Sequence, residues 1–206
     1  MTTSLRTRKP WIAAAIMAAA LVTAACGGDD DKSTESSDTT VKSSSASTTT
    51  LVTSTKTTDT GDLSSAFEHI AGYELAELPA SVLANAREQY QTEVSGNTVA
   101  EKAVTEINGR TVSKEGDDVA IVLGMSFARG ISSQPGFQEG FVEGAAGDDA
   151  SSVTLSGEDA SVFTQPDGTE GVVFAKGRLG LLVIGTGEAT STELQDIMSK
   201  LIGNNT

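Results

Sequence analysis

Hydroxyl side chains fill one segment near the start of the chain, and this segment limits where a folded core can form. Between Gly27 and Thr60, 19 of 34 residues are Ser or Thr, and none is aromatic or proline. Such a composition buries too little apolar surface to offset the entropy of ordering the chain. We therefore expect a disordered tether over residues 26–60 and a single globular domain over residues 61–206.

The residues that precede the tether have the three parts of an export signal. Three basic residues lie among the first nine, an uncharged apolar run follows from Trp11 to Val22, and small residues lead to Cys26. The apolar run is shorter than the about 20 residues that a membrane-spanning helix needs. This order predicts a secretory signal peptide over residues 1–25.

Cys26 is the only cysteine of the chain, and it directly follows the small residues. The sequence LVTAAC resembles the lipobox of bacterial lipoproteins, whose cysteine is lipidated and becomes the first mature residue. The resemblance implies that acyl chains on Cys26 enter the lipid bilayer, and that the protein lies on the outer, extracytoplasmic face of the cell membrane. Two or three chains anchor a protein durably, whereas one holds it only reversibly. Secretion with a free thiol and an uncleaved anchor are the alternatives.

The spacing of apolar residues after the tether changes from helical to alternating and back to helical. It predicts helices over Leu63–Ala71 with Asp62 as N-cap, over Ala80–Val94, over a glycine-containing segment near 136–144, and from Thr190 to an end at Gly203. Alternation predicts strands over 104–114, 119–128, 153–155, 160–164, 170–176 and 179–184. Together these elements predict an α+β fold, a single domain with an antiparallel sheet of about five or six strands and helices packed on it.

Glycine recurs every fourth residue in the predicted helix between the two groups of strands. Gly136, Gly140 and Gly144 would share one stripe, with Glu139 and Glu143 between them. Each interior glycine costs about 1 kcal/mol relative to alanine, so the stripe needs compensation by close approach of another group. One interpretation is packing of the stripe against a sheet, for example against the small-residue face of the strand over 119–128. A second makes these five residues a surface that binds a ligand or partner, and a third leaves the helix kinked or unformed.

Carboxylates dominate the charge of the predicted domain. Residues 61–206 contain 22 acidic and eight basic residues, a net charge of −14. Such a surface disfavours nucleic acid as a partner. His69 is the only histidine and no nucleophile-elbow sequence is present, so we predict no catalytic residue. We likewise predict no cofactor and no metal site, because the Asp29–Asp31 run lacks the glycine and distal glutamate of a calcium loop and the chain has one His and one Cys.

The stretch GVVFAKGRLGLLVIG, followed by the capped final helix, resembles the folded part of uncharacterised actinobacterial lipoproteins. That resemblance transfers no activity. The leading hypothesis is a membrane-anchored lipoprotein whose soluble domain is a non-catalytic module that binds an envelope protein or a small ligand. The alternatives are an envelope hydrolase with an unrecognised site, and a regulator or assembly factor for a membrane protein.

Overall fold

The computed structural model describes residues 56–147, 149–187 and 189–206. The predicted signal peptide, Cys26 and residues 26–55 of the predicted tether lie outside the described residues. The strands are β1 (Glu74–Glu77), β2 (Val104–Lys114), β3 (Asp117–Phe127), β4 (Ser151–Leu155), β5 (Glu158–Thr164), β6 (Glu170–Lys176) and β7 (Leu179–Gly185). The helices are α1 (Thr57–Thr60), α2 (Ala80–Glu93), the 3-10 helix η2 (Ala100–Lys102), α3 (Arg129–Ser132), α4 (Phe137–Ala146) and α5 (Ser191–Asn205).

All seven strands join one antiparallel sheet in the order β1-β2-β3-β7-β6-β5-β4. The α+β fold predicted from the sequence is confirmed, and the seventh strand is β1, which the apolar pattern did not predict. Two-residue turns close the β2–β3 and β4–β5 hairpins, with positive φ at Glu115 and Gly116 and at Ser156 and Gly157. Positive φ at both turn residues matches the right-handed twist of the strands that the turn joins.

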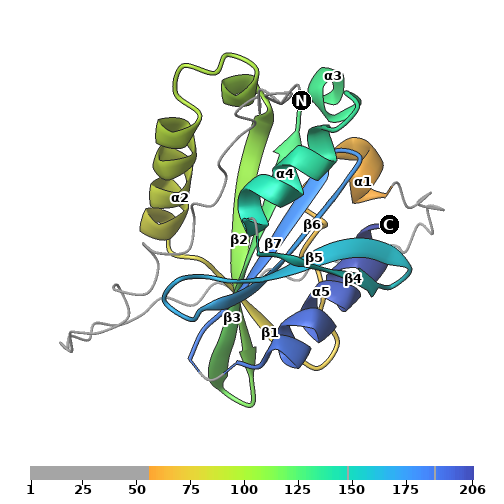
Figure 1. Ribbon diagram of the computed structural model, residues 1–206. Coiled ribbons are helices and arrows are strands. Elements are labelled where there is room, and N and C mark those ends of the chain that lie inside the picture. The colour runs from red at the N-terminus through yellow and green to blue at the C-terminus, as the bar shows by residue number, and fades with distance from the viewer. Residues whose placement is uncertain (1–55, 148, 188) are drawn as a thin grey trace, which may run out of the picture.

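Helices cover both faces of the sheet (Figure 1). One face packs against α2 and α4, where the Phe127 ring meets the Phe137 and Phe141 rings edge-on, with centroids 4.9 Å apart in each pair. The other face packs against α5 and the segment 63–70. Edge-to-face aromatic packing adds to the energy of burial alone, so α4 is held firmly on the sheet.

Strand β3 has two unlike faces, as the sequence predicted. Its bulky residues Leu123, Met125 and Phe127 point to α2 and α4, whereas Ala120 and Gly124 point to the opposite face. A Cβ on Gly124 would lie 2.6 Å from the Phe67 ring, so this glycine makes room for an aromatic side chain. The glycine-containing helix does pack on the sheet, but on its bulky face, so the suggestion that it packs on the small-residue face is wrong.

Residues 63–71 form turns and not the predicted helix. Leu63, Phe67 and Ile70 are all buried, as the spacing required, but they pack separately on the sheet face that α5 also covers. Asp62 accepts hydrogen bonds from the backbone N–H (2.9 Å) and hydroxyl (2.6 Å) of Ser64, so it caps a turn. Local Asx turns of this kind compete with helix formation.

The final helix begins as predicted and ends later. Thr190 is its N-cap, and its hydroxyl accepts a hydrogen bond from the Glu193 N–H at 3.3 Å. The predicted end at Gly203 is wrong, because α5 continues to Asn205. Asn205 is buried, and its side-chain amide donates to the carbonyls of Ala66 and Leu201, so the last turn is fixed by the core.

The last residues of the predicted tether belong to the folded domain. Thr57 and Thr58 are buried, and α1 lies beside the C-terminal end of α5 (Figure 1). The Arg178 backbone N–H donates to the Thr58 carbonyl at 2.7 Å, and its guanidinium donates to the carbonyls of Phe127 (2.9 Å) and Thr60. Arg178 therefore secures the start of the domain to the β6–β7 turn.

Candidate functional site

The five residues of the predicted binding surface lie on and beside α4, but they do not form one stripe. Gly136 precedes the helix as its N-cap with φ +78°, so the glycine pattern within α4 is limited to Gly140 and Gly144. Both helical glycines are half-buried, and Glu139 and Glu143 are exposed. The structure thus gives this surface two adjacent carboxylates on a helix that covers β5 and β6.

His69, the only histidine of the chain, lies in the segment 63–71 that forms turns. His69 is exposed, and its backbone carbonyl accepts a hydrogen bond from the Asn204 side chain at 2.6 Å. Within the three described ranges, no group of three or more His, Cys, Asp or Glu side chains is placed to hold a metal ion. No helix in the described part of the chain is long and apolar enough to cross a membrane.

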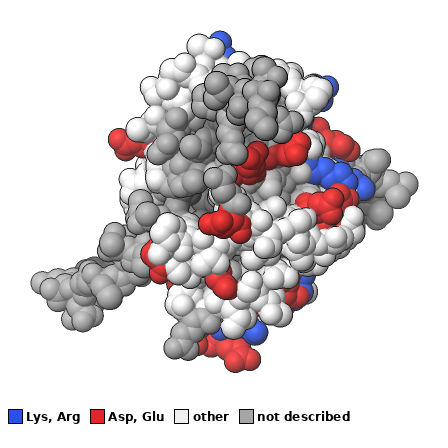
Figure 2. All heavy atoms as spheres, viewed as in Figure 1, with Lys and Arg blue, Asp and Glu red and all other residues white. Residues whose placement is uncertain are grey.

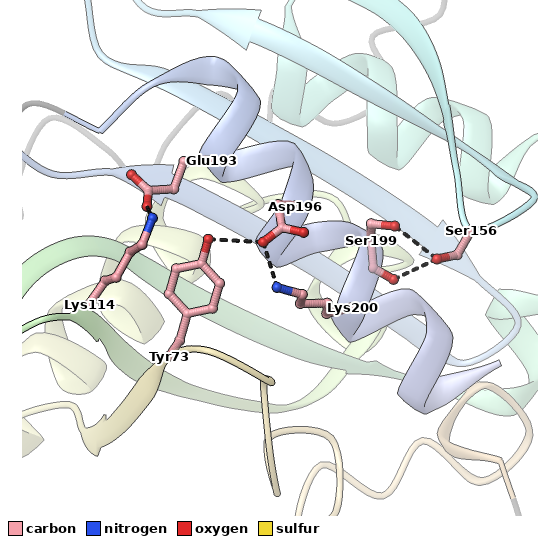
Figure 3. Close-up of polar contacts among 7 residues, drawn as sticks. All are labelled: Tyr73, Lys114, Ser156, Glu193, Asp196, Ser199 and Lys200. Carbon is pink, nitrogen blue, oxygen red and sulfur yellow. Dashed lines mark hydrogen bonds and ion pairs between the residues drawn. The ribbon is translucent and has the colours of Figure 1, made fainter.

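A polar network connects α5 to neighbouring elements (Figure 3). Asp196 accepts a hydrogen bond from the Tyr73 hydroxyl at 3.0 Å and from the Lys200 ammonium at 2.6 Å. Glu193 pairs with Lys114 of β2 at 2.9 Å. The ammonium groups of Lys200 and Lys114 lie 5.0 and 5.8 Å from the centre of the Tyr73 ring. The network therefore joins α5 to β2 and to the residue before β1.

The electrostatics of this network favour its present protonation states. The Lys200 ammonium lowers the pKa of the Asp196 carboxyl, and the Glu193 carboxylate raises the pKa of Lys114. Partial burial, together with the hydrogen bond to Asp196, raises the pKa of the Tyr73 hydroxyl. Each ionised group already has a partner of opposite charge. We therefore interpret the network as a clamp that holds α5 on the strands.

A second contact of α5 fixes the β4–β5 hairpin. The Ser156 hydroxyl donates to the Ser199 carbonyl at 2.8 Å and lies 2.9 Å from the Ser199 hydroxyl (Figure 3). On the neighbouring strands, Lys176 pairs with Glu158 at 2.5 Å. These contacts hold the hairpin at the edge of the sheet in a defined position.

The edge strand β4 presents unpaired backbone groups. It pairs with β5 alone, through the register Ser151↔Val162 to Leu155↔Glu158 without a bulge. Because Leu155 and Glu158 flank a two-residue turn, the N–H and C=O of Leu155, Val153 and Ser151 point to β5. Those of Ser152 and Thr154 point away from the sheet, and no described residue forms a backbone hydrogen bond with them.

The two edges of the sheet differ in how they are protected. At the opposite edge, β1 has glutamates at both ends, Glu74 and Glu77, and charges on an edge strand oppose pairing with another chain. All five residues of β4 are uncharged, and neither proline nor a bulge interrupts it. Among the described strands, β4 is therefore the edge best suited to accept a further strand.

Sequence analysis predicted a strand over 153–155 but did not identify it as an edge. The run SSVTL combines β-branched and small hydroxyl residues without charge, which is a signal available in the sequence. Its position at the edge depends on the strand order, and the short apolar segments do not encode that order locally. Comparison of this chain with protein-family models, with curated proteins and with solved structures finds no match to any of them.

Proposed function

We propose that this chain is an exported lipoprotein, anchored through acyl chains on Cys26 to the outer face of the cell membrane, whose domain binds a partner protein by strand addition at β4. The single observation that supports binding is the open, uncharged β4 edge. Strand addition gives affinity through main-chain hydrogen bonds and specificity through alternate side chains. The partner is an extended segment of another protein of the cell envelope.

Anchoring and binding are tested separately. Cys26→Ala removes the sulfur that would carry the acyl chains, so the variant should accumulate as a precursor or leave the membrane fraction. Mass spectrometry of the wild-type protein should find acyl chains on residue 26. A bare thiol there, or unchanged membrane retention of the variant, would refute the anchor.

Strand addition is tested at Thr154, whose backbone N–H points away from the sheet. Thr154→Pro removes this N–H without breaking a β4–β5 hydrogen bond, because proline is tolerated on an edge strand where the N–H is outward. Thr154→Ala removes the side chain and keeps the N–H, so it is the matched control. A photocrosslinker at Ser152 in intact cells should give a defined adduct in wild type and in Thr154→Ala, and lose it in Thr154→Pro. Equal yields of that adduct in all three proteins would contradict strand addition.

A further inference from the structure

We propose that the strand accepted by β4 has alternating residues, with Lys or Arg on the side that faces α4 and apolar residues on the side that faces α5. This inference rests on the proposed strand addition and adds the chemistry of the partner. It follows from the two faces of β4, from Asp159 on the neighbouring strand, and from the charge of the domain.

On the α4 side of the β4 edge the side chains are short, and a carboxylate, Asp159, lies on the neighbouring strand β5. Ser152 and Thr154 point to this side, opposite Ser161 and Asp159 of β5, and all except half-buried Ser161 are exposed. An added strand would lie about 10 Å from β5, because neighbouring strands are about 4.8 Å apart. The short hydroxyl side chains leave the space above β4 open. A Lys or Arg side chain of the partner can therefore extend over β4 to the Asp159 carboxylate.

The α5 side of the same edge is apolar. Leu155 is buried in the core on this face and Val153 packs against it half-buried. A residue of the partner beside Val153 would extend this apolar row, as cross-strand pairs of β-branched residues do. The Ser156–Ser199 contact keeps the hairpin against α5, so the row is formed in the free protein.

The charges around the edge favour a cationic occupant. Residues 61–206 contain 22 acidic and eight basic residues. Three of the five lysines among the described residues, Lys114, Lys176 and Lys200, are paired with carboxylates. Among the same residues, Asp159, Glu139 and Glu143 form no ion pair. Acidic side chains predominate on the face that carries α4 (Figure 2). This field attracts a basic segment and repels a second copy of this chain.

The test uses the mature chain from residue 26 and three synthetic peptides of equal length, in which Val alternates with Lys, Gln or Glu. Binding is followed by backbone amide NMR shifts at low and high salt. We expect the Lys peptide to bind most tightly, to shift the amides of β4 and β5, and to weaken with salt. The Glu peptide should bind least.

Two variants separate the inference from the function on which it rests. Asp159→Asn should weaken the Lys peptide by about two- to fivefold and leave the Gln peptide unchanged, as expected for one exposed ion pair. Glu115→Gln, at the remote β2–β3 turn, is the charge-matched control and should have no effect. Thr154→Pro should weaken every peptide that binds by about tenfold or more.

Three outcomes would contradict different parts of the proposal. If Lys and Gln peptides bind equally and both are lost in Thr154→Pro, strand addition stands and the cationic partner is refuted. If the Lys peptide binds equally to wild type and Thr154→Pro, strand addition itself is refuted. A dimer of the wild-type chain in sedimentation that Thr154→Pro abolishes would make a second copy the occupant and would also overturn the inference.

Discussion

Raising the pH provides a direct test of the core on the α2 side of the sheet. Tyr90 is only 8% exposed, and its hydroxyl donates to the Ala100 carbonyl at 2.6 Å. Burial raises the pKa of Tyr90 to about 12, compared with the ordinary value of about 10 that applies to the unfolded chain. The folded chain thus holds this proton more tightly than the unfolded chain does.

The sign and size of the effect follow from this difference. A raised pKa stabilises the fold fully below pH 10, and the stabilisation disappears as the pH rises from about 10 to about 12. The difference corresponds to about 3 kcal/mol, since each pKa unit is worth about 1.4 kcal/mol. In Tyr90→Phe the unfolding free energy should therefore fall less between pH 10 and 12, because no phenol is left to ionise at this position. At neutral pH the variant should be less stable only because it loses the hydrogen bond to the Ala100 carbonyl.

Tyrosinate absorbance measures the ionisation directly, because Tyr73 and Tyr90 are the only tyrosines of the chain. The hydroxyls of both have raised pKa values, so the folded protein should show little tyrosinate at pH 10. Tyr73→Phe isolates the signal of Tyr90, and circular dichroism on the same samples shows whether the chain is still folded. A Tyr90 midpoint near pH 10 in folded protein would refute the reasoning.

Two further predictions concern the packing of the domain. Arg178→Ala removes two charge-assisted hydrogen bonds, one to Thr60 at the domain start and one to Phe127 at the end of β3. The unfolding free energy in urea should therefore fall by about 2 kcal/mol, and amide exchange in α1 should accelerate. An equal loss in Arg129→Ala, an exposed arginine, would contradict this assignment. Gly124→Val should cost about 1–3 kcal/mol in thermal unfolding, because its side chain would meet the Phe67 ring, and Phe67→Leu in the same chain should recover part of the loss.

Local patterns predicted most elements, and tertiary packing decided the exceptions. The alternation along β3 and the Thr190–Glu193 spacing each determine a local structure, and both predictions are confirmed. The spacing of Leu63, Phe67 and Ile70 fits a helix and a chain of turns equally well. The choice between these two structures depends on the packing of the Phe67 ring against Gly124. Strand β1 has a single half-buried residue, Leu75, among its four, so its sequence carries almost no apolar signal.

The candidate site was less predictable than the fold. Sequence reasoning selected the glycines and glutamates of α4 because their spacing is conspicuous, whereas the structure places Gly136 outside the helix. Whether a strand lies at an open edge depends on the strand order. In this sheet, residues 151–155 form an edge strand although they lie in the second half of the chain. No local pattern contains that information.

The last strand of the chain occupies the centre of the sheet. β7 lies between β3 and β6, so among the described strands it alone pairs with both the β1–β3 meander and the β4–β6 meander. A chain that is synthesised N-terminus first has no strand pairing between the two meanders until residues 179–185 are made. Non-local strand pairing of this kind slows folding. A stop codon before Leu179 would therefore leave β3 and β6 as edge strands with unpaired backbone N–H and C=O groups. We expect such a fragment to aggregate or be degraded instead of folding in part.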